Sequence, residues 1–388
     1  MNRIILFSLL TLFLATQCGK NDTANLLAIF PLNHTKVENN FENFVDKLVL
    51  IPISESKENL ISDISKIIIG NNNNFLFLDG NAVVKVFSPD GKFIRDIGTK
   101  GRGPGEYINI EDICLTADGN YLLILQTGSV NKYRVSDGSF ITKIEIPRKN
   151  YDAICSSING SFYLFSSNPA DDSNFETPFY ALSNFSEKGK LIKELLPRKD
   201  FVFTQGIFTQ SYDKSTIMRP QEGDNIAYKI RDEVVPFLKI DFQERAIPSR
   251  YIFRESNDLY RGMKNYLYSE YYKLPIYIHD TRKFIYFSSI GPRAKQNDFL
   301  FNIENCNGIH WTYEQNDNDP LFIMASDDEF FYTSIYIDTE SLNYSSYSDT
   351  SFKANNLTDY LLKNICKTND RENKLFVAKI KFKIDEKI

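Results

Sequence analysis

Short apolar runs alternate along this chain with turns rich in glycine, asparagine and aspartate. The run 83–87 ends at Ser88-Pro89-Asp90-Gly91, and a second run, 92–97, begins directly after it. Proline presets the first central dihedral of a tight turn, and glycine accepts the positive φ that the next position needs, so the chain doubles back here. The pattern therefore predicts two antiparallel strands.

The same turn recurs further along the chain. Asp118-Gly119 and Asp137-Gly138 stand in register with Asp90-Gly91, and apolar runs such as 121–125 separate them. Recurrence of one turn at a fixed period indicates a structural repeat, here of four short strands. Aromatic residues make up 14% of the chain, with Phe 31 and Tyr 22, which also favours strands over helices.

A glycine-rich stretch separates the first repeat from the second. Four glycines and a proline fall between Gly98 and Gly105, a density that excludes both a helix and a regular strand ladder. The stretch is predicted to be an exposed loop that links the last strand of one sheet to the first strand of the next.

Residues 64 to 147 carry a resemblance to a known family. The segments GKFIRDIGTKGRGPGEY, DICLTADGNYLLIL and VNKYRVSDGSFITKIEIP resemble the six-bladed β-propeller lipoproteins of Gram-negative bacteria, whose blades are similar to NHL repeats. In that family GxGPGEY marks the link between the first and second blades. The resemblance implies an all-β fold, a six-bladed propeller formed as one domain over residues 46–388.

Two stretches depart from the strand pattern. Apolar residues fall near helical spacing within 249–274 and again within 357–365, which predicts short helical insertions. The final run, 376–384, alternates strictly between apolar residues and mostly lysine, which predicts an outermost, half-buried strand. Because an open ring would expose blade edges, we expect this strand to share the last blade with residues 48–53 or 61–69.

The N-terminus predicts export and a lipid anchor. Arg3 precedes an apolar run, 4–14, that is too short to span a bilayer but has the length of a secretory signal. Ala15-Thr16-Gln17-Cys18 resembles a lipobox, with Gln17 where a small residue is usual. We predict a signal peptide over 1–17, lipid attachment at Cys18 and an irregular tether over 18–45, which places the protein in the cell envelope, anchored to the outer membrane. The alternative is an ordinary signal peptide cut nearby.

Composition limits the partners. The net charge is -5 and there is no basic stretch, so a nucleic acid is not expected as a partner. The chain has no nucleotide-binding loop, dinucleotide fingerprint or hydrolase nucleophile motif, and we predict no cofactor. Cys114 and Cys155 occupy similar places in successive repeats, so the two thiols could lie close together.

The glycine-rich loop supplies the candidate ligand contacts. Arg102 could pair with an anionic group, Glu106 could accept hydroxyl donors, and Tyr107 could stack on a sugar or an aromatic ring. The structural alternative is that Arg102 and Glu106 pair with each other or cap backbone groups, with Tyr107 packed between blades. Glycine-rich sequences usually reflect backbone geometry, which favours this alternative.

The sequence therefore predicts an envelope-anchored binding or scaffold module whose ligand is a glycan, a peptide or another envelope protein. The competing hypothesis is a metal-dependent propeller hydrolase or lactonase. Glu111 and Asp112 begin an inner strand and could face the channel, where related hydrolases hold a metal. A metal site needs several convergent oxygen ligands, and one adjacent pair is more typical of a solvated channel wall.

Overall fold

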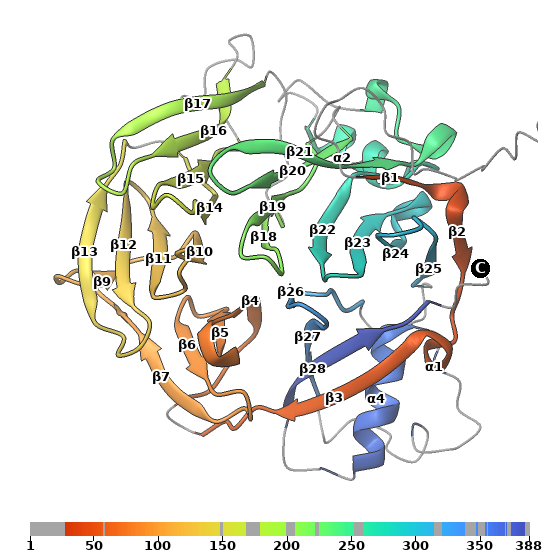
Figure 1. Cartoon of the computed structure of the whole chain (residues 1–388), viewed down its shortest axis with the longest axis horizontal. Helices are drawn as coiled ribbons and strands as arrows, with labels where there is room; N and C mark the ends of the chain where they lie inside the picture. Colours follow the sequence, from red (N-terminus) through yellow and green to blue (C-terminus); the bar gives the residue numbers. More distant parts are fainter. Residues whose placement is uncertain are drawn as a thin grey trace, which may run out of the picture.

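Six small sheets surround a central axis, each presenting its first strand to the axis and its last strand to the rim (Figure 1). The computed structural model describes residues 28–56, 59–147, 150–167, 179–198, 206–221, 225–251, 259–313, 320–337, 347, 354, 356–368, 370 and 374–384. The predicted six-bladed β-propeller is confirmed. Within the described residues no helix combines the length and the apolar character needed to cross a bilayer.

The first three blades follow one another along the chain. Blade 1 holds β4 (Ile64–Ile69), β5 (Phe75–Asp79), β6 (Val84–Phe87) and β7 (Phe93–Ile97). Blade 2 holds β10 (Asp112–Leu115), β11 (Tyr121–Gln126), β12 (Ser129–Arg134) and β13 (Phe140–Glu145). Blade 3 holds β14 (Ala153–Ser156), β15 (Phe162–Phe165), β16 (Phe179–Phe185) and β17 (Leu191–Arg198). In these blades neighbouring strands are antiparallel.

The other three blades include strands from the N-terminal segment. Blade 4 holds β18 (Phe208–Gln210), β19 (Thr216–Met218), β20 (Ile226–Ile230), β21 (Val234–Asp241) and β1 (Ala28–Pro31). Blade 5 holds β22 (Pro275–Asp280), β23 (Phe284–Ile290), β24 (Gln296–Asn302), β25 (Gly308–Thr312) and β2 (Thr35–Val37). Blade 6 holds β26 (Ala325–Ser326), β27 (Phe331–Tyr336), β28 (Leu375–Phe382) and β3 (Val45–Pro52).

The ring closes in blade 6, where β28 pairs antiparallel with β3, so that Ala378 lies opposite Leu50. The first of the two predicted closures, through 48–53, is confirmed. The prediction that the C-terminal strand is outermost is wrong, because β3 lies outside β28. The lysine face of β28 is covered because the Lys379 ammonium lies 4.2 Å from the centre of the Phe330 ring and bonds to Asp327.

The N-terminal segment runs along the rim of blades 4, 5 and 6 (Figure 1). Strand β1 adds parallel to β21, and β2 adds parallel to β25, with η1 (Leu32–His34) between them and α1 (Phe41–Phe44) before β3. The predicted tether over 18–45 is therefore wrong from residue 28 onward. Short parallel edge strands bond through their backbones, which leaves little trace in the apolar pattern. Cys18 and the predicted signal peptide lie outside the described residues.

Apolar side chains fill the interfaces between blades. Each pair of neighbouring blades shares one cluster of buried residues within the described part of the chain. Between blades 6 and 1, for example, Phe75 lies edge-on to Tyr332 with ring centres 6.1 Å apart. Each buried large apolar side chain contributes about 1.5–3 kcal/mol, so the ring depends on all of these interfaces together.

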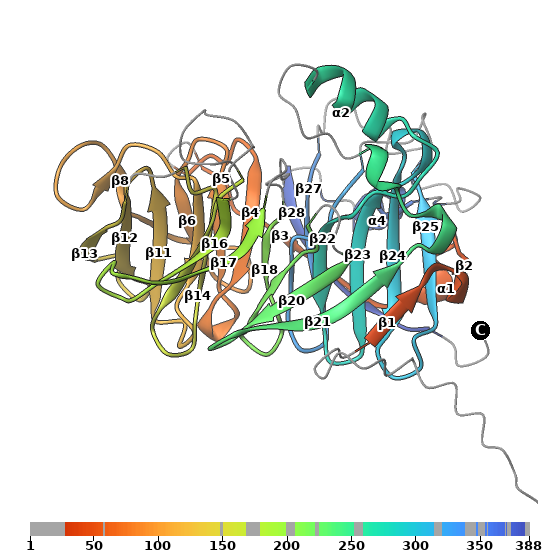
Figure 2. The same cartoon turned by 90° about the horizontal axis from the view of Figure 1, so that it is seen from above.

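Both predicted helical insertions are present. Helix α2 (Leu259–Leu267) belongs to the connection from blade 4 to blade 5, and α4 (Leu357–Thr368) packs beside blade 6. Figure 2 shows α2 rising from the same face of the ring as the loop that carries β8 (Thr99–Lys100). Both segments connect an outer strand to the next inner strand. We call this side the insertion face; inner strands begin there and end at the opposite face.

Candidate functional site

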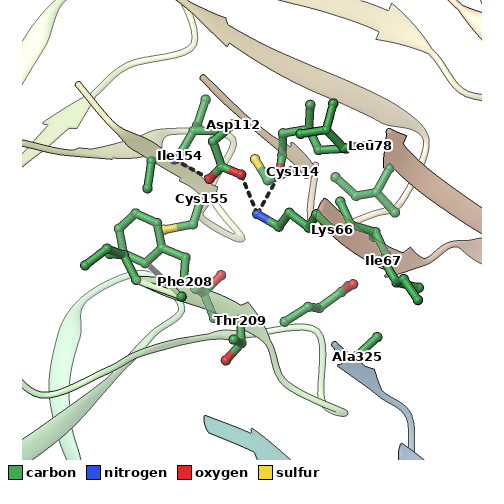
Figure 3. A pocket seen from close by; sticks show the side chains of 18 of the residues that line it. Lys66, Ile67, Leu78, Asp112, Cys114, Ile154, Cys155, Phe208, Thr209 and Ala325 are labelled. Atoms are coloured by element: carbon green, nitrogen blue, oxygen red, sulfur yellow. Dashed lines mark hydrogen bonds and ion pairs between the residues drawn. The ribbon is translucent and has the colours of Figure 1, made fainter. Parts of the chain in front are cut away.

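A cavity of about 400 Å³ lies on the central axis of the ring. Its walls come from inner strands β4, β10, β14, β18 and β26, with Tyr277 added from β22. Figure 3 shows side chains from these strands converging on one space. The lining includes Asp152, just before β14, and Ser156, the last residue of that strand, so the cavity extends along the whole inner strand from the insertion face.

Lys66 and Asp112 form the polar centre of this cavity. The Lys66 Nζ donates to Asp112 Oδ1 at 2.7 Å and to the Ile113 carbonyl at 2.8 Å, while Asp112 Oδ2 accepts from the Ile154 backbone N–H at 2.9 Å (Figure 3). The two side chains are only 22% and 12% exposed, so little water screens the pair. The chain of bonds joins the inner strands of blades 1, 2 and 3 and neutralises both charges.

Two thiols line the cavity on adjacent inner strands. Cys114 lies on β10 and Cys155 on β14, and both are free cysteines (Figure 3). Burial raises the pKa of the Cys114 thiol and of the Cys155 thiol above the usual value. A thiol held in its protonated form is a poor nucleophile, so these side chains serve as small apolar wall residues.

The rest of the wall is largely apolar. Ile67, Leu78, Phe208 and Ala325 border the cavity in Figure 3. Thr209 also borders it, but its hydroxyl donates to the Ile278 carbonyl in the next blade, so it holds blades 4 and 5 together. The cavity therefore combines apolar surface with a few fixed polar groups, which is typical of small-molecule sites.

Carboxylates mark the end of the cavity at the insertion face. Glu111 and Asp152 are the residues immediately before β10 and β14, and both line the cavity. Asp152 Oδ2 accepts from the Ser167 N–H at 2.7 Å, and burial raises the pKa of Asp152. Within the described residues neither carboxylate forms an ion pair. The prediction that Glu111 and Asp112 face the channel is supported, although Asp112 is bonded to Lys66.

A second cavity, of about 440 Å³, lies at the opposite face. It shares Gln210, Lys214 and Ser326 with the first cavity, so the two cavities adjoin. Its carboxylates are paired: Asp327 with Lys379 at 3.5 Å, Asp328 with Arg282 at 2.5 Å, and Glu329 with Lys381 at 3.0 Å. The two ends of the channel therefore differ, because only the insertion face presents unpaired carboxylates among the described residues.

The glycine-rich loop lies at the rim, away from the channel, as the position of β9 (Glu106–Tyr107) in Figure 1 shows. Glu106 Oε2 accepts from the Gly103 N–H at 2.6 Å, and a Cβ on Gly101 would lie 2.0 Å from the same oxygen. The glycines thus let the loop close around the carboxylate. This geometry supports the structural alternative for Glu106.

Tyr107 is 1% exposed and packs between blades 1 and 2. A Cβ on Gly98, which has φ +71°, would lie 2.7 Å from the Tyr107 ring, so glycine is needed for the close approach. The ring offers no free face for stacking in this conformation. Arg102 is exposed on the same loop and lines neither cavity.

Sequence reasoning missed Lys66 and Phe208 as channel residues. Lys66 is the only charge in the run Ile64–Ile69, and a lone charge inside an apolar inner strand is a usable signal for a buried ion pair. Phe208 carries no such signal, because nothing in its neighbourhood distinguishes a channel position from a position between blades.

Comparisons with known proteins agree with the fold and leave the activity open. A family model described as "Domain of unknown function (DUF4934)" matches residues 27–387. A crystal structure of a "Putative exported protein" from Bacteroides fragilis aligns with a TM-score of 0.70 at 19% identity, covering 93% of this chain and 100% of that one. A member of the DUF4221 family from Bacteroides vulgatus aligns with a TM-score of 0.54 at 12% identity, covering 88% and 97%. No curated protein sequence matches the chain.

Proposed function

The chain belongs to the DUF4934 family, and we propose that it is an exported binding module of the cell envelope that holds its ligand in the central channel. The observation that carries this proposal is the cavity of about 400 Å³ enclosed by the inner strands. Its volume lies within the range of roughly 300–1,000 Å³ that is usual for ligand sites, and its wall mixes apolar and polar groups. The ligand classes proposed are a glycan, a peptide or a segment of another envelope protein.

The groups at the centre of the cavity favour binding over catalysis. The Lys66 ammonium and the Asp112 carboxylate are bonded to each other, and both thiols are held protonated. An ion pair and protonated thiols form part of the cavity wall, but they do not supply a base or a nucleophile.

A channel-blocking variant tests the binding site. Gln210 lines both cavities and its side chain forms no hydrogen bond with the described residues, so Gln210→Trp fills the channel without removing a structural contact. We expect a ligand found by nuclear magnetic resonance screening of soluble glycans and short peptides to lose binding at least tenfold. Thr142→Trp, on the exposed outer strand β13, is the control and should bind normally. Unchanged binding to a folded Gln210→Trp protein would place the ligand elsewhere.

We propose lipid attachment at Cys18 as the means of anchoring to the outer membrane. The support is the apolar run 4–14 followed by a cysteine that stands before the first strand of the fold. The neighbouring structure from Bacteroides fragilis is described as exported, which is compatible with this location. Labelled palmitate should enter the protein expressed in a Gram-negative host and should not enter its Cys18→Ala form. Equal labelling of the two forms would remove the proposal.

The glycine-rich loop is proposed as a surface separate from the channel. Arg102 is exposed there and remains the residue through which the loop could meet a partner. Arg102→Ala should leave binding in the channel unchanged, because the loop lies at the rim. A loss of channel binding in this variant would show that loop and channel act together.

The alternative function is a metal-dependent hydrolase of the propeller type. It needs several oxygen ligands that converge in the channel. In the part of the chain that the structure describes, no group of three or more His, Cys, Asp or Glu side chains lies close enough to hold a metal ion. Elemental analysis of the folded protein tests this alternative, and stoichiometric calcium or zinc would favour it.

A further inference from the structure

We infer that the ligand of the channel is a short peptide or peptide-like amphiphile whose free ammonium group lies at the insertion face, between Glu111 and Asp152. The inference rests on the proposed function, since it names the ligand class for the same cavity. It selects the peptide class over a neutral glycan.

The first observation is a local excess of negative charge. At the insertion face Glu111 and Asp152 line the cavity, and neither forms an ion pair among the described residues, although the exposed Glu111 accepts a hydrogen bond from the Asn109 amide. Asp112 and Lys66 neutralise each other, and the exposed Lys214 lines the other end of the cavity. The carboxylates that line the second cavity are also paired with Lys or Arg. Unpaired carboxylates at the mouth of a low-dielectric channel attract a cation and disfavour an anion.

The second observation is a buried hydroxyl without a partner. Ser326 is 6% exposed, lines both cavities, and its Oγ makes no hydrogen bond with any residue that the structure describes. A buried polar atom left unpaired costs about 1–3 kcal/mol, so the site is completed when a ligand supplies a donor or an acceptor there. Ser326 is the last residue of β26 and lies where the two cavities meet. It therefore offers a second polar contact, away from the carboxylates.

The third observation is the surface between these two contacts. Ile154, Phe208 and Ala325 line the cavity together with the protonated Cys155 thiol. Such a wall buries an apolar side chain and offers few groups to the many hydroxyls of a sugar. An ammonium group, an apolar side chain and a backbone amide in one small molecule match the three observations, and a short peptide carries all three.

The inference is tested by calorimetry with four probes: phenylalanyl-leucine amide, which carries a free ammonium group; its N-acetylated form, which is neutral; N-acetyl-phenylalanyl-leucine, which is an anion; and cellobiose, a neutral disaccharide. We expect saturable binding of the first probe, at least tenfold weaker binding of the acetylated amide, and no detectable binding of the anion. A charge-assisted hydrogen bond is large enough to give such a difference. Binding of the cationic probe should also weaken with added salt.

Charge-removing variants locate the ammonium group. Glu111→Gln and Asp152→Asn each keep a hydrogen-bond acceptor, and the asparagine can still accept from the Ser167 N–H. The double variant should lose about tenfold in affinity for the cationic probe and nothing for the acetylated amide. Glu145→Gln, on the outer strand β13, removes the same charge far from the channel and is the matched control. Thermal unfolding checks that all variants are folded.

The outcomes separate this inference from the proposed function. Equal binding of the free and acetylated amides, unchanged affinity in the double variant, or no saturable binding of the cationic probe overturns the inference. If cellobiose or the acetylated probe binds instead and Gln210→Trp abolishes that binding, the channel remains the binding site and only the ligand class is wrong.

Discussion

Lys66 shows how one residue serves three blades. It lies on β4 of blade 1, bonds to the side chain and backbone of blade 2, and through Asp112 reaches the backbone of blade 3. A lysine on an inner strand is costly to bury unless its charge is paired and its hydrogen bonds are made. Here the carboxylate and the Ile113 carbonyl provide both, so the residue stabilises the channel wall.

Lys66→Met should lower the free energy of unfolding by about 1–3 kcal/mol, because Asp112 then keeps a partly buried charge without a partner. Urea denaturation measures this difference. Adding Asp112→Asn should recover part of the loss, since the asparagine still accepts from the Ile154 N–H. Lys92→Met breaks an exposed pair with Asp90 that solvent screens, so it should leave the urea midpoint almost unchanged. Equal losses in the two lysine variants would contradict this account.

The buried carboxyl group of Asp298, on β24, should make the stability of the protein depend on pH. The side chain is fully buried, and burial raises the pKa of Asp298 to about 7, although Gln296 donates to its Oδ1 at 3.1 Å. The folded state thus holds a proton that the unfolded state, with a carboxyl pKa of about 3.9, releases earlier. Stability that is present below pH 4 is therefore lost as the pH rises through about 7.

Asp298→Asn should remove this loss. Its free energy of unfolding relative to the original protein should rise between pH 4 and pH 8, by on the order of 1–4 kcal/mol. The variant must be compared with the original protein because His279 has an opposite effect on stability. Burial lowers the pKa of His279 to about 3, so both proteins lose stability as the pH falls below about 6.5. A difference between the proteins that stays constant with pH would refute the assignment to Asp298.

The N-terminal segment acts at the scale of elements. Strands β1 and β2 cover the outer edges of blades 4 and 5, which would otherwise present unpaired backbone groups. Phe30 fixes β1 in place, because its side chain is buried and its ring centre lies 4.8 Å from that of Phe301. The segment is therefore part of the fold and not a spacer.

Phe30→Ala should lower the free energy of unfolding by about 3–5 kcal/mol, the usual cost of deleting a buried aromatic ring. Val37→Ala, on β2, is the matched control, because Val37 is exposed and its loss should change stability by about 0.5 kcal/mol or less. Thermal or urea unfolding compares the two. A Phe30→Ala protein as stable as the control would mean that β1 does not contribute to the folded ring.

Hairpin glycines bring blades 1 and 3 close to the blades before them. Gly91, with φ +82°, turns between β6 and β7, and a Cβ there would lie 2.0 Å from the Pro52 carbonyl at the end of β3. Gly189 makes the same approach to the Glu145 carbonyl in blade 2, at 2.3 Å. Glycine is required at these positions for close contact as well as for its dihedral angle.

Gly91→Ala should therefore destabilise the protein by about 2–5 kcal/mol, from backbone strain and from the clash together. Gly160 separates the two effects, since it has φ +84° but only Glu187 Oε2 near its missing Cβ, at 3.9 Å. Gly160→Ala should cost only about 1–2 kcal/mol. Similar losses at the two sites would show that contact between blades is not what selects the glycine.

At the scale of the whole molecule, the ring is held by the pairing of its two ends. Strand β28 lies between β27 and β3, and its buried Val377 belongs to the cluster shared by blades 6 and 1. Removing β28 would leave two unpaired strand edges and would open the interface between blades 6 and 1. The other blades would then no longer be held in a closed ring.

A chain that ends at residue 374 should lose cooperative unfolding and tend to aggregate. Hydrogen exchange should show the largest loss of protection in β27 and β3, which lose their ladder partner. Size-exclusion chromatography reports the aggregation. A truncated protein that stays monomeric with an unchanged unfolding midpoint would rule out closure through β28.

Much of this architecture was predictable because blades repeat a local pattern. The turn at Asp90-Gly91 and its counterpart at Asp137-Gly138 need particular backbone angles, and short-range chemistry decides those. The partners of strands distant in sequence carry no such local signal. That is why β1 was mistaken for a tether, and why β28 was placed outside β3.

The candidate site divides in the same way. Glu111 and Asp112 are polar and lie at the start of an inner strand, which indicated that they face the channel. The ion pair between Lys66 and Asp112 joins two blades, so it depends on how those blades pack. For Tyr107 the sequence offered a stacking ring, and packing between blades buried it.

The sequence by itself determined the strands and their turns, because apolar period and turn chemistry act between neighbours along the chain, and the six-bladed ring was what the family resemblance implied. Only the tertiary structure decided which charges neutralise each other, which aromatic rings are buried and which carboxylates face the channel unpaired. Those outcomes depend on distances between residues that lie far apart in the sequence, and packing alone sets such distances.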